Sequence, residues 1–324
     1  MPGSAMSEAP GPHGEAWRPS ATREALRQRA ELVERTRRFF ADRGVLEVDT
    51  PVLQGGANLD SGVLPFRLEL PGGPRFLPTS PEHPLKRLLA AGSGDVWTLA
   101  PAFRSQELGR LHSPEFRMLE WYRLGWDDTR LLDEVVALFA SLTGAPAQLE
   151  VLSWREAFRR HAGIDPHSVD DQTLARVIGD DAAIVAGDSR AALDLVQVAR
   201  VEPHLGIGRW TALVDYPAEA SAQARLRTGE DGLQVAARFE VYRDGIELAN
   251  GYHELTDAAE LASRLEAELR SRSGGELHDQ RFAEAMRAGL PDCAGVAVGF
   301  DRLVMLALRL PSVALTRAFA WERQ

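Results

Sequence analysis

Apolar side chains recur at helical spacing near the start of the chain. Between Leu26 and Phe40 they return every three or four residues, which indicates one buried helix face. Ser20 and Thr22 are both suitable N-cap residues, so the helix is predicted to begin there and to end near Arg43.

The rest of the chain alternates between helical and extended patterns. Further helices are predicted at 84–91, 128–142, 153–161, 257–272, 278–288 and 301–310, and 165–210 is predicted to be mostly helical. Strands are predicted at 45–53, 96–106, 115–124, 210–217, 238–242, 246–254 and 294–299, with short strands in 62–78. Pro51 interrupts the first of these strands, which should therefore lie at a sheet edge or an interface. Antiparallel hairpins mixed with helices predict an α+β domain.

Composition narrows the class of protein. The 324 residues are 44% hydrophobic and 26% charged, which is ordinary for a globular chain. No apolar run approaches the roughly 18–20 residues that cross a bilayer, so no membrane association is expected. Residues 1–19 lack an apolar core and are predicted to be a flexible tail, followed by one domain over 20–324. The single cysteine, Cys293, excludes an internal disulfide framework and fits a reducing cytoplasm.

The charged residues carry two signals. The net charge of −10 argues against a broad basic face for nucleic acid. Among the 37 Lys and Arg residues, only Lys86 is a lysine. A GC-rich genome is the simplest explanation of that bias.

The first candidate for chemistry lies in 103–122. On the strand 115–124, Phe116, Glu120 and Tyr122 share one face. Arg104, on the preceding strand, can donate two hydrogen bonds to a phosphate. An arginine beside an aromatic surface suits a nucleoside triphosphate. The alternative is a half-buried hairpin with solvated polar groups.

A second constellation lies around a predicted turn at 243–245. Asn250, Tyr252 and Glu254 share one strand face. Glu240 and Glu247 flank the turn and could converge on Mg²⁺, which prefers oxygen ligands. The alternative is a pair of ordinary solvated acids.

The third constellation is a glycine-rich strand that runs into a helix. Small residues in 295–299 permit close approach of a flat ligand, and Arg302 lies in the first turn of the helix. The alternative is simple packing, which a glycine-rich strand–helix turn favours when it stands alone.

Taken in order, these three segments resemble the signature motifs of class II aminoacyl-tRNA synthetases. The lysyl branch is the most similar, through the segments Thr79–Glu82, His112–Phe116, Met118–Tyr122, Glu247–Glu254 and Gly299–Arg302. The resemblance extends from about residue 20 to the C-terminus. It implies a class II catalytic core, with an antiparallel sheet flanked by helices, and a homodimer.

The subfamily follows from what precedes the first helix. Lysyl-tRNA synthetases carry an N-terminal OB-fold that needs about 100 residues or more, and only about twenty residues are present here. The chain therefore resembles the lysyl-synthetase-like ligases that modify elongation factor P. Ser80 and Ala297, in place of alanine and glycine, also match that group.

This resemblance implies an activity. The enzyme would activate (R)-β-lysine or lysine with ATP as an acyl-adenylate and transfer it to a lysine side chain of elongation factor P. No stable tRNA binding is expected. Two alternatives stay open: an enzyme that charges RNA, and a catalytically inactive regulatory subunit.

The resemblance also implies residue roles. Arg104 and Arg302 would be catalytic. ATP would contact Arg104, Ser105, Gln106, His112, Ser113, Phe116, Glu247, Leu248, Gly299 and Arg302. The amino acid would contact Ser80, Pro81, Glu82, Glu120, Tyr122, Asn250, Tyr252, Glu254 and Ala297. Glu240 and Glu247 would hold Mg²⁺.

Two positions raise further questions. The family usually reads Phe-Arg-Asn-Glu where this chain reads Phe-Arg-Ser-Gln over 103–106. Either Glu107 compensates by a shift of one residue, or the nucleotide contact is weakened. In addition, an enzyme that makes an activated lysyl group can acylate its own amines. Lys86 and the N-terminus are the only amines available, so a low lysine content would limit self-modification.

Overall fold

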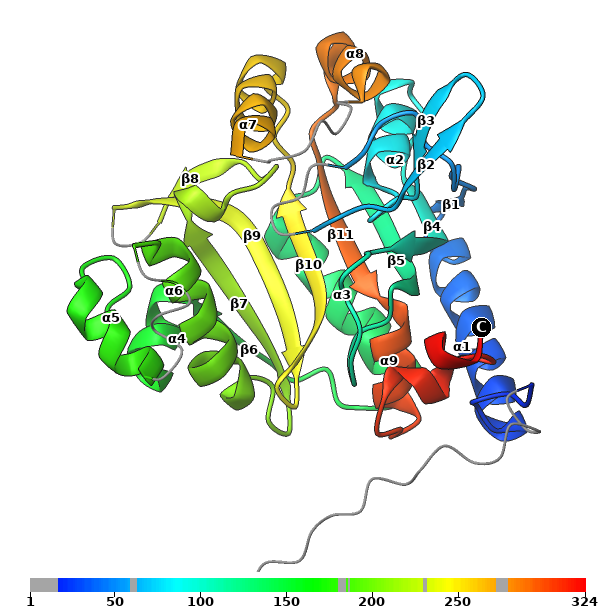
Figure 1. Cartoon of the computed structure of the whole chain (residues 1–324), viewed down its shortest axis with the longest axis horizontal. Coiled ribbons are helices and arrows are strands. Elements are labelled where there is room, and N and C mark those ends of the chain that lie inside the picture. Colours follow the sequence, from blue (N-terminus) through cyan, green and yellow to red (C-terminus); the bar gives the residue numbers. More distant parts are fainter. Residues whose placement is uncertain (1–16, 59–62, 180–184, 186, 230–231, 272–278) are drawn as a thin grey trace, which may run out of the picture.

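A single large sheet organises the molecule. In the computed structural model, which describes residues 17–58, 63–179, 185, 187–229, 232–271 and 279–324, nine strands of this part of the chain form it (Figure 1). The strands run in the order β1-β4-β5-β11-β10-β9-β7-β6, and β8 pairs with β9. The predicted α+β class is confirmed. The predicted tail lies largely outside the described residues, and its division from the domain stays a prediction.

The helices and strands have the following bounds. The strands are β1 (Leu46–Glu47), β2 (Arg67–Leu70), β3 (Gly73–Phe76), β4 (Val96–Phe103), β5 (Glu115–Leu124), β6 (Leu149–Ser153), β7 (Trp210–Pro217), β8 (Leu226–Thr228), β9 (Gln234–Arg243), β10 (Ile246–His253) and β11 (Cys293–Gly299). The α-helices are α1 (Arg23–Ala41), α2 (Glu82–Ala90), α3 (Asp128–Thr143), α4 (Trp154–His161), α5 (Asp171–Ile178), α6 (Ser189–Val196), α7 (Ala258–Ser271), α8 (Gln280–Gly289) and α9 (Phe300–Ala307).

The sheet is antiparallel in its centre and parallel at both edges. β4, β5, β11, β10, β9 and β7 pair antiparallel, whereas β1 pairs parallel with β4 and β6 pairs parallel with β7. The predicted antiparallel sheet thus forms the centre, and one parallel strand is added at each edge. The predicted strand 45–53 is too long, because only Leu46 and Glu47 pair, although they do lie at the predicted edge. Pro51 lacks the N–H that a longer ladder would need.

Alternation along β5 separates the two faces of the sheet. Leu119 and Trp121 point to the face covered by α3, where they join the largest hydrophobic core with Leu131 and Phe139. Figure 1 shows α3 behind the central strands. The intervening residues of β5 face the opposite side, which stays open as a cavity. The sheet thus has one face for stability and one for chemistry.

The N-terminal helix begins as predicted and ends slightly early. The Thr22 hydroxyl accepts a hydrogen bond from the Ala25 N–H at 3.1 Å and caps α1. The helix ends at Ala41, and Gly44 then adopts a left-handed φ of 68°. Strands β6 and β8 were not predicted, because both are short and lie at the margins of the sheet.

Candidate active site

A cavity of about 1000 Å³ lies over the open face of the central strands. Strand register builds its floor, because one row of paired residues crosses four strands: Glu120 on β5, Ala297 on β11, Asn250 on β10 and Glu240 on β9. Segments far apart in the sequence thus place their side chains side by side.

Most of the predicted site residues line this one cavity. They are Ser80, Glu82, Arg104, His112, Ser113, Phe116, Glu120, Tyr122, Glu240, Glu247, Leu248, Asn250, Tyr252, Glu254, Ala297, Gly299 and Arg302. Three predicted residues, Pro81, Ser105 and Gln106, are not among the lining residues. Pro81 instead precedes α2 as its N-cap residue. The roles of all these residues stay proposals.

Two arginines, each paired with a glutamate, lie at one end of the cavity. The guanidinium of Arg104 lies 5.3 Å from the centre of the Phe116 ring. Its Nη1 is 3.3 Å from Oε1 of Glu107, which also lines the cavity, whereas Gln106 is exposed. Of the two alternatives for this departure from the family motif, the geometry favours compensation by Glu107.

Arg302 anchors a second segment at the same end. Its Nη1 donates to the Glu247 carbonyl at 2.9 Å and lies 3.2 Å from Oε2 of that residue. Its Nε donates to the Leu111 carbonyl at 3.1 Å, and its Nη2 lies 2.6 Å from Nε2 of His112. Burial of the imidazole is the main cause that lowers the pKa of His112, and the positive charge of Arg302 is the next. The neutral imidazole is therefore favoured. Arg302 therefore joins the β4–β5 loop to β10.

The other end of the cavity is anionic. Glu82, Glu120 and Glu254 are all buried there, and the Tyr122 hydroxyl donates to Oε1 of Glu120 at 2.9 Å. Burial, followed by the charge of Glu82, raises the pKa of Glu120 well above its usual range. Oε2 of Glu120 is buried and has no hydrogen-bond partner within the described part of the chain. An unpaired buried carboxylate oxygen is costly, so it points to a cationic ligand.

Gly295 leaves the space that the side chains of Tyr122 and Glu254 occupy. A Cβ there would lie 2.2 Å from the Tyr122 ring and 2.7 Å from Oε1 of Glu254. Both contacts are far shorter than van der Waals distances, so the sequence needs glycine to keep phenol and carboxylate together.

The lone lysine also lies here, which overturns one expectation. Lys86 is 1% exposed and forms ion pairs with Glu82 and Glu254, so it is no surface amine open to acylation. Burial alone would lower its pKa, but the charges of Glu254 and Glu82 outweigh this and raise it. Lys86 therefore stays protonated.

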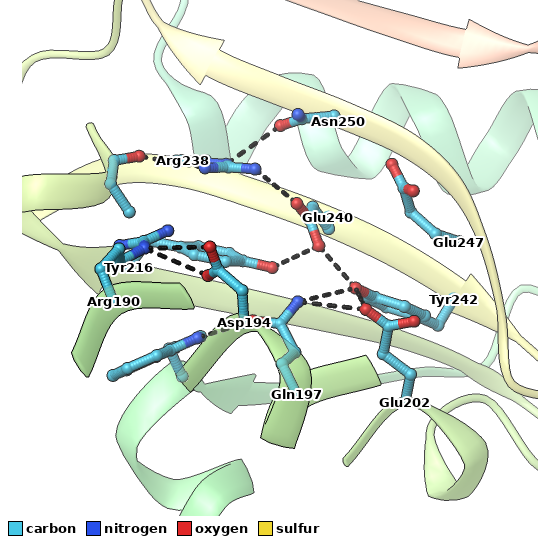
Figure 2. A network of polar contacts seen from close by, with 12 residues as sticks. Arg190, Asp194, Gln197, Glu202, Tyr216, Arg238, Glu240, Tyr242, Glu247 and Asn250 are labelled. Carbon is cyan, nitrogen blue, oxygen red and sulfur yellow. Dashed lines mark hydrogen bonds and ion pairs between the residues drawn. The ribbon is translucent and has the colours of Figure 1, made fainter. Parts of the chain in front are cut away.

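A polar network surrounds Glu240 (Figure 2). Its Oε1 accepts from Arg238 at 2.5 Å, and its Oε2 accepts from the hydroxyls of Tyr216 and Tyr242, both at 2.5 Å. Three of its roughly four lone-pair positions are thus in use. Figure 2 marks no hydrogen bond or ion pair between Glu247 and the other residues drawn, and Glu247 lines the cavity.

These contacts test the predicted Mg²⁺ site. Among the described residues, no three His, Cys, Asp or Glu side chains are arranged to hold a metal ion. Glu247 and the remaining lone pair of Glu240 could supply two ligands, and triphosphate oxygens would complete the shell. The residues fit a cation that arrives with ATP rather than a resident metal.

Sequence reasoning missed the wall formed by 189–202. Arg190, Asp194 and Gln197 line the cavity, and Gln197 lies at the start of a single π-helical turn, Gln197–Val201. The Gln197 amide donates to Glu202 at 3.2 Å and to Tyr242 at 3.4 Å (Figure 2). No local motif marks these residues, because the helical pattern of this segment does not show that it borders a cavity.

Comparison with known proteins agrees with this geometry. Residues 15–323 match the family described as tRNA synthetases class II (D, K and N). The chain belongs to this class II synthetase family. Proteins named elongation factor P–(R)-β-lysine ligase from Salmonella dublin, Salmonella paratyphi B and Salmonella heidelberg are each 45% identical to it over 322 residues. The alignment covers 95% of this chain and 98% of each relative. The family assigned from the motifs is confirmed.

The lengths and apolar content of the helices bear on membrane association, which was not expected. Within the described ranges, no helix is long and apolar enough to cross a bilayer.

Proposed function

We propose that this protein is an AMP-forming ligase that activates (R)-β-lysine or lysine with ATP and transfers it to a lysine side chain of elongation factor P. Its relatives of nearly equal length carry that activity in their name. The assigned roles of the site residues belong to this proposal.

One observation carries the proposal: the cavity separates two opposite charges. Arg104 and Arg302 lie at one end, which suits ATP, with Arg104 toward a phosphate and Arg302 against the base. Glu82, Glu120 and Glu254 lie at the other, which suits ammonium groups. A diamino acid can span the two, with its carboxylate toward the arginines and an ammonium among the carboxylates.

The chemistry then needs no protein nucleophile. A carboxylate oxygen of the amino acid attacks the α-phosphorus of ATP, and the bond to pyrophosphate breaks. Arg104 stabilises charge on the α-phosphate, and Phe116 and Arg302 hold the adenine between them. An acceptor amine next attacks the acyl carbon, AMP leaves, and the amine loses a proton as the amide forms.

The proposed ATP contacts follow the predicted set except at Ser105 and Gln106, which do not line the cavity. His112, Ser113, Leu248 and Gly299 line the nucleotide end, and Glu107 takes the place of Gln106. Mg²⁺ on the triphosphate would neutralise phosphate charge, with Glu247 and Glu240 as its protein ligands.

The partners follow from the same reasoning. The acceptor is elongation factor P in the cytoplasm, with no stable tRNA complex. The protein acts as a homodimer formed through α1 and the segment that follows it, where Leu46 and Leu53 are 55% and 49% exposed. Exposed leucines beside a sheet edge are typical of a subunit interface.

Two assays test this function. ATP–pyrophosphate exchange that depends on (R)-β-lysine or lysine would support activation, whereas no exchange with either amino acid would favour an inactive subunit. Labelled amino acid is then offered with elongation factor P or with tRNA. An acid-stable amide on the protein supports the proposal, and an ester on tRNA contradicts it.

A further inference from the structure

The only lysine of the chain lies behind the anionic end of the cavity. Its Nζ is 2.6 Å from Oε1 of Glu82, 2.6 Å from Oε2 of Glu254 and 3.0 Å from Oε1 of Gln223. The contacts with Glu82 and Gln223 are hydrogen bonds, and the contact with Glu254 is an ion pair. Lys86 itself does not line the cavity, although its three partners do. It can therefore affect a ligand only through them.

Lys86 partly neutralises the carboxylates at this end of the cavity. Glu82, Glu120 and Glu254 supply three carboxylates, and Lys86 supplies one ammonium. When all four are ionised, the net charge is minus two, which two substrate ammonium groups would neutralise. Without Lys86 the same carboxylates would exceed those two ammonium groups by one charge.

We propose that Lys86 is a positioning and specificity-determining residue that fixes the charge of the amine pocket, so that the pocket selects an amino acid with two ammonium groups. It bridges Glu82 and Glu254, holds them apart, and leaves the unpaired Oε2 of Glu120 for the substrate. This inference rests on the proposed function, because it takes a diamino acid as the substrate. It adds a residue that does not touch that substrate.

Every charged neighbour is consistent with this role. Burial raises the pKa of Glu254 to about 7, and the charge of Lys86 opposes a further rise. The charge of Lys86 likewise opposes the raised pKa of Glu120 on β5. The other groups that face this cluster are Tyr122 on β5, Cys293 on β11 and Arg225 beside Glu254. On the far side of α2, Asp279 pairs with His83 and not with Lys86.

The test is Lys86→Met, which keeps the length of the side chain and removes its charge. Amino-acid and ATP dependence of pyrophosphate exchange are measured from pH 6 to pH 9. Loss of Lys86 should raise the pKa values of Glu120 and Glu254, because the charge of Lys86 lowers both. The pH midpoint for amino-acid binding should therefore rise by about one unit or more, and KM at pH 7 should rise about tenfold. KM for ATP should change less than about threefold.

A buried ion pair under the other face of the sheet provides the control. Glu134 lies 3.3 Å from Arg123 and accepts from the Trp121 indole at 3.0 Å, outside the cavity. Glu134→Gln should lower the melting temperature without moving the pH midpoint. If Lys86→Met behaves in the same way, Lys86 only supports the fold and the inference is overturned.

A double variant keeps the test decisive if Lys86→Met does not fold. Lys86→Met with Glu82→Gln removes one charge of each sign and restores the net charge of minus two. Its pH midpoint should return toward the native value, although KM rises because one carboxylate is lost. A midpoint that stays high would contradict the charge argument.

Calorimetric titration of (R)-β-lysine and lysine into the native and variant proteins separates two failures. If the native protein binds a diamino acid but shows no exchange, the proposed function fails. The pH midpoints of binding in the native and variant proteins then still test the role of Lys86. If neither amino acid binds the native protein, both proposals are overturned.

Discussion

Arg104 pairs with Glu107, one position later than the family motif would place its acidic partner, with Nη1 3.3 Å from Oε1. The pairing orients the guanidinium that we assign to the α-phosphate. Glu107→Gln should therefore lower the rate of pyrophosphate exchange about tenfold, because the arginine loses its charged partner. Gln106→Ala, at an exposed position outside the cavity, is the matched control and should stay within about twofold of native. Equal losses in both variants would contradict the shift.

Phosphate chemistry should depend on both cavity arginines. Arg104→Ala and Arg302→Ala should each lower adenylate formation about 10²-fold, the usual effect of removing one preorganised donor. Arg160, which pairs with Glu150 and Glu156 outside the cavity, gives the control Arg160→Ala. Rates are measured by pyrophosphate exchange, and unchanged exchange in both cavity variants would remove these arginines from the site.

A substitution in the amine pocket should affect binding of the diamino acid more than binding of ATP. Glu254→Gln should raise KM for the diamino acid about tenfold or more, because a desolvated ammonium loses its counter-charge. KM for ATP should change less than about threefold. Asp292→Asn is the control, since Asp292 pairs with Arg225 outside the cavity. A larger effect on ATP than on the amino acid would refute the assignment.

Stability should depend on the protonation of Glu202. Burial, followed by the charges of Glu240 and Glu247, raises its pKa to about 7. The folded protein thus binds this proton more tightly than the unfolded chain, whose glutamates titrate near about 4.3. Stability from this group falls as pH rises from about 4.5 to about 7. The melting temperature of Glu202→Gln relative to native should therefore increase between pH 5 and pH 8, and exposed Glu156→Gln should show no such trend.

Assembly should depend on the exposed leucines that follow α1. Leu46→Asp and Leu53→Asp together should convert a dimer into a monomer, because charge would enter an apolar interface. Light scattering at micromolar concentration measures the mass. A native protein that already scatters as a 35.5 kDa monomer would argue against the dimer.

The sequence predicted the residues that line the cavity better than the residues that pack behind them. Alternation along β5, which is a local signal, placed Glu120 and Tyr122 on one face, and the resemblance of the motifs placed Arg302 in the same site. Lys86 was misjudged, since nothing local shows that Glu254, far along the chain, would bury it. Arg190 and Gln197 were missed because a helical pattern does not show that this segment reaches the cavity and Tyr242.

The same long-range pairing explains the errors in the fold. Strand β6 exists because it pairs with β7, about sixty residues later, and β1 is short because β4 offers it only two partners. A local pattern of apolar residues contains neither fact.

The burial of Lys86 has a practical consequence for experiments with an acceptor protein. Every other basic side chain in this chain is an arginine or a histidine. Reagents that cross-link or tag lysine amines would therefore find, on the folded enzyme, only its N-terminal amine. In a mixture of enzyme and acceptor, each modified lysine identified by mass spectrometry would belong to the acceptor, so sites of transfer can be mapped without separating the two proteins.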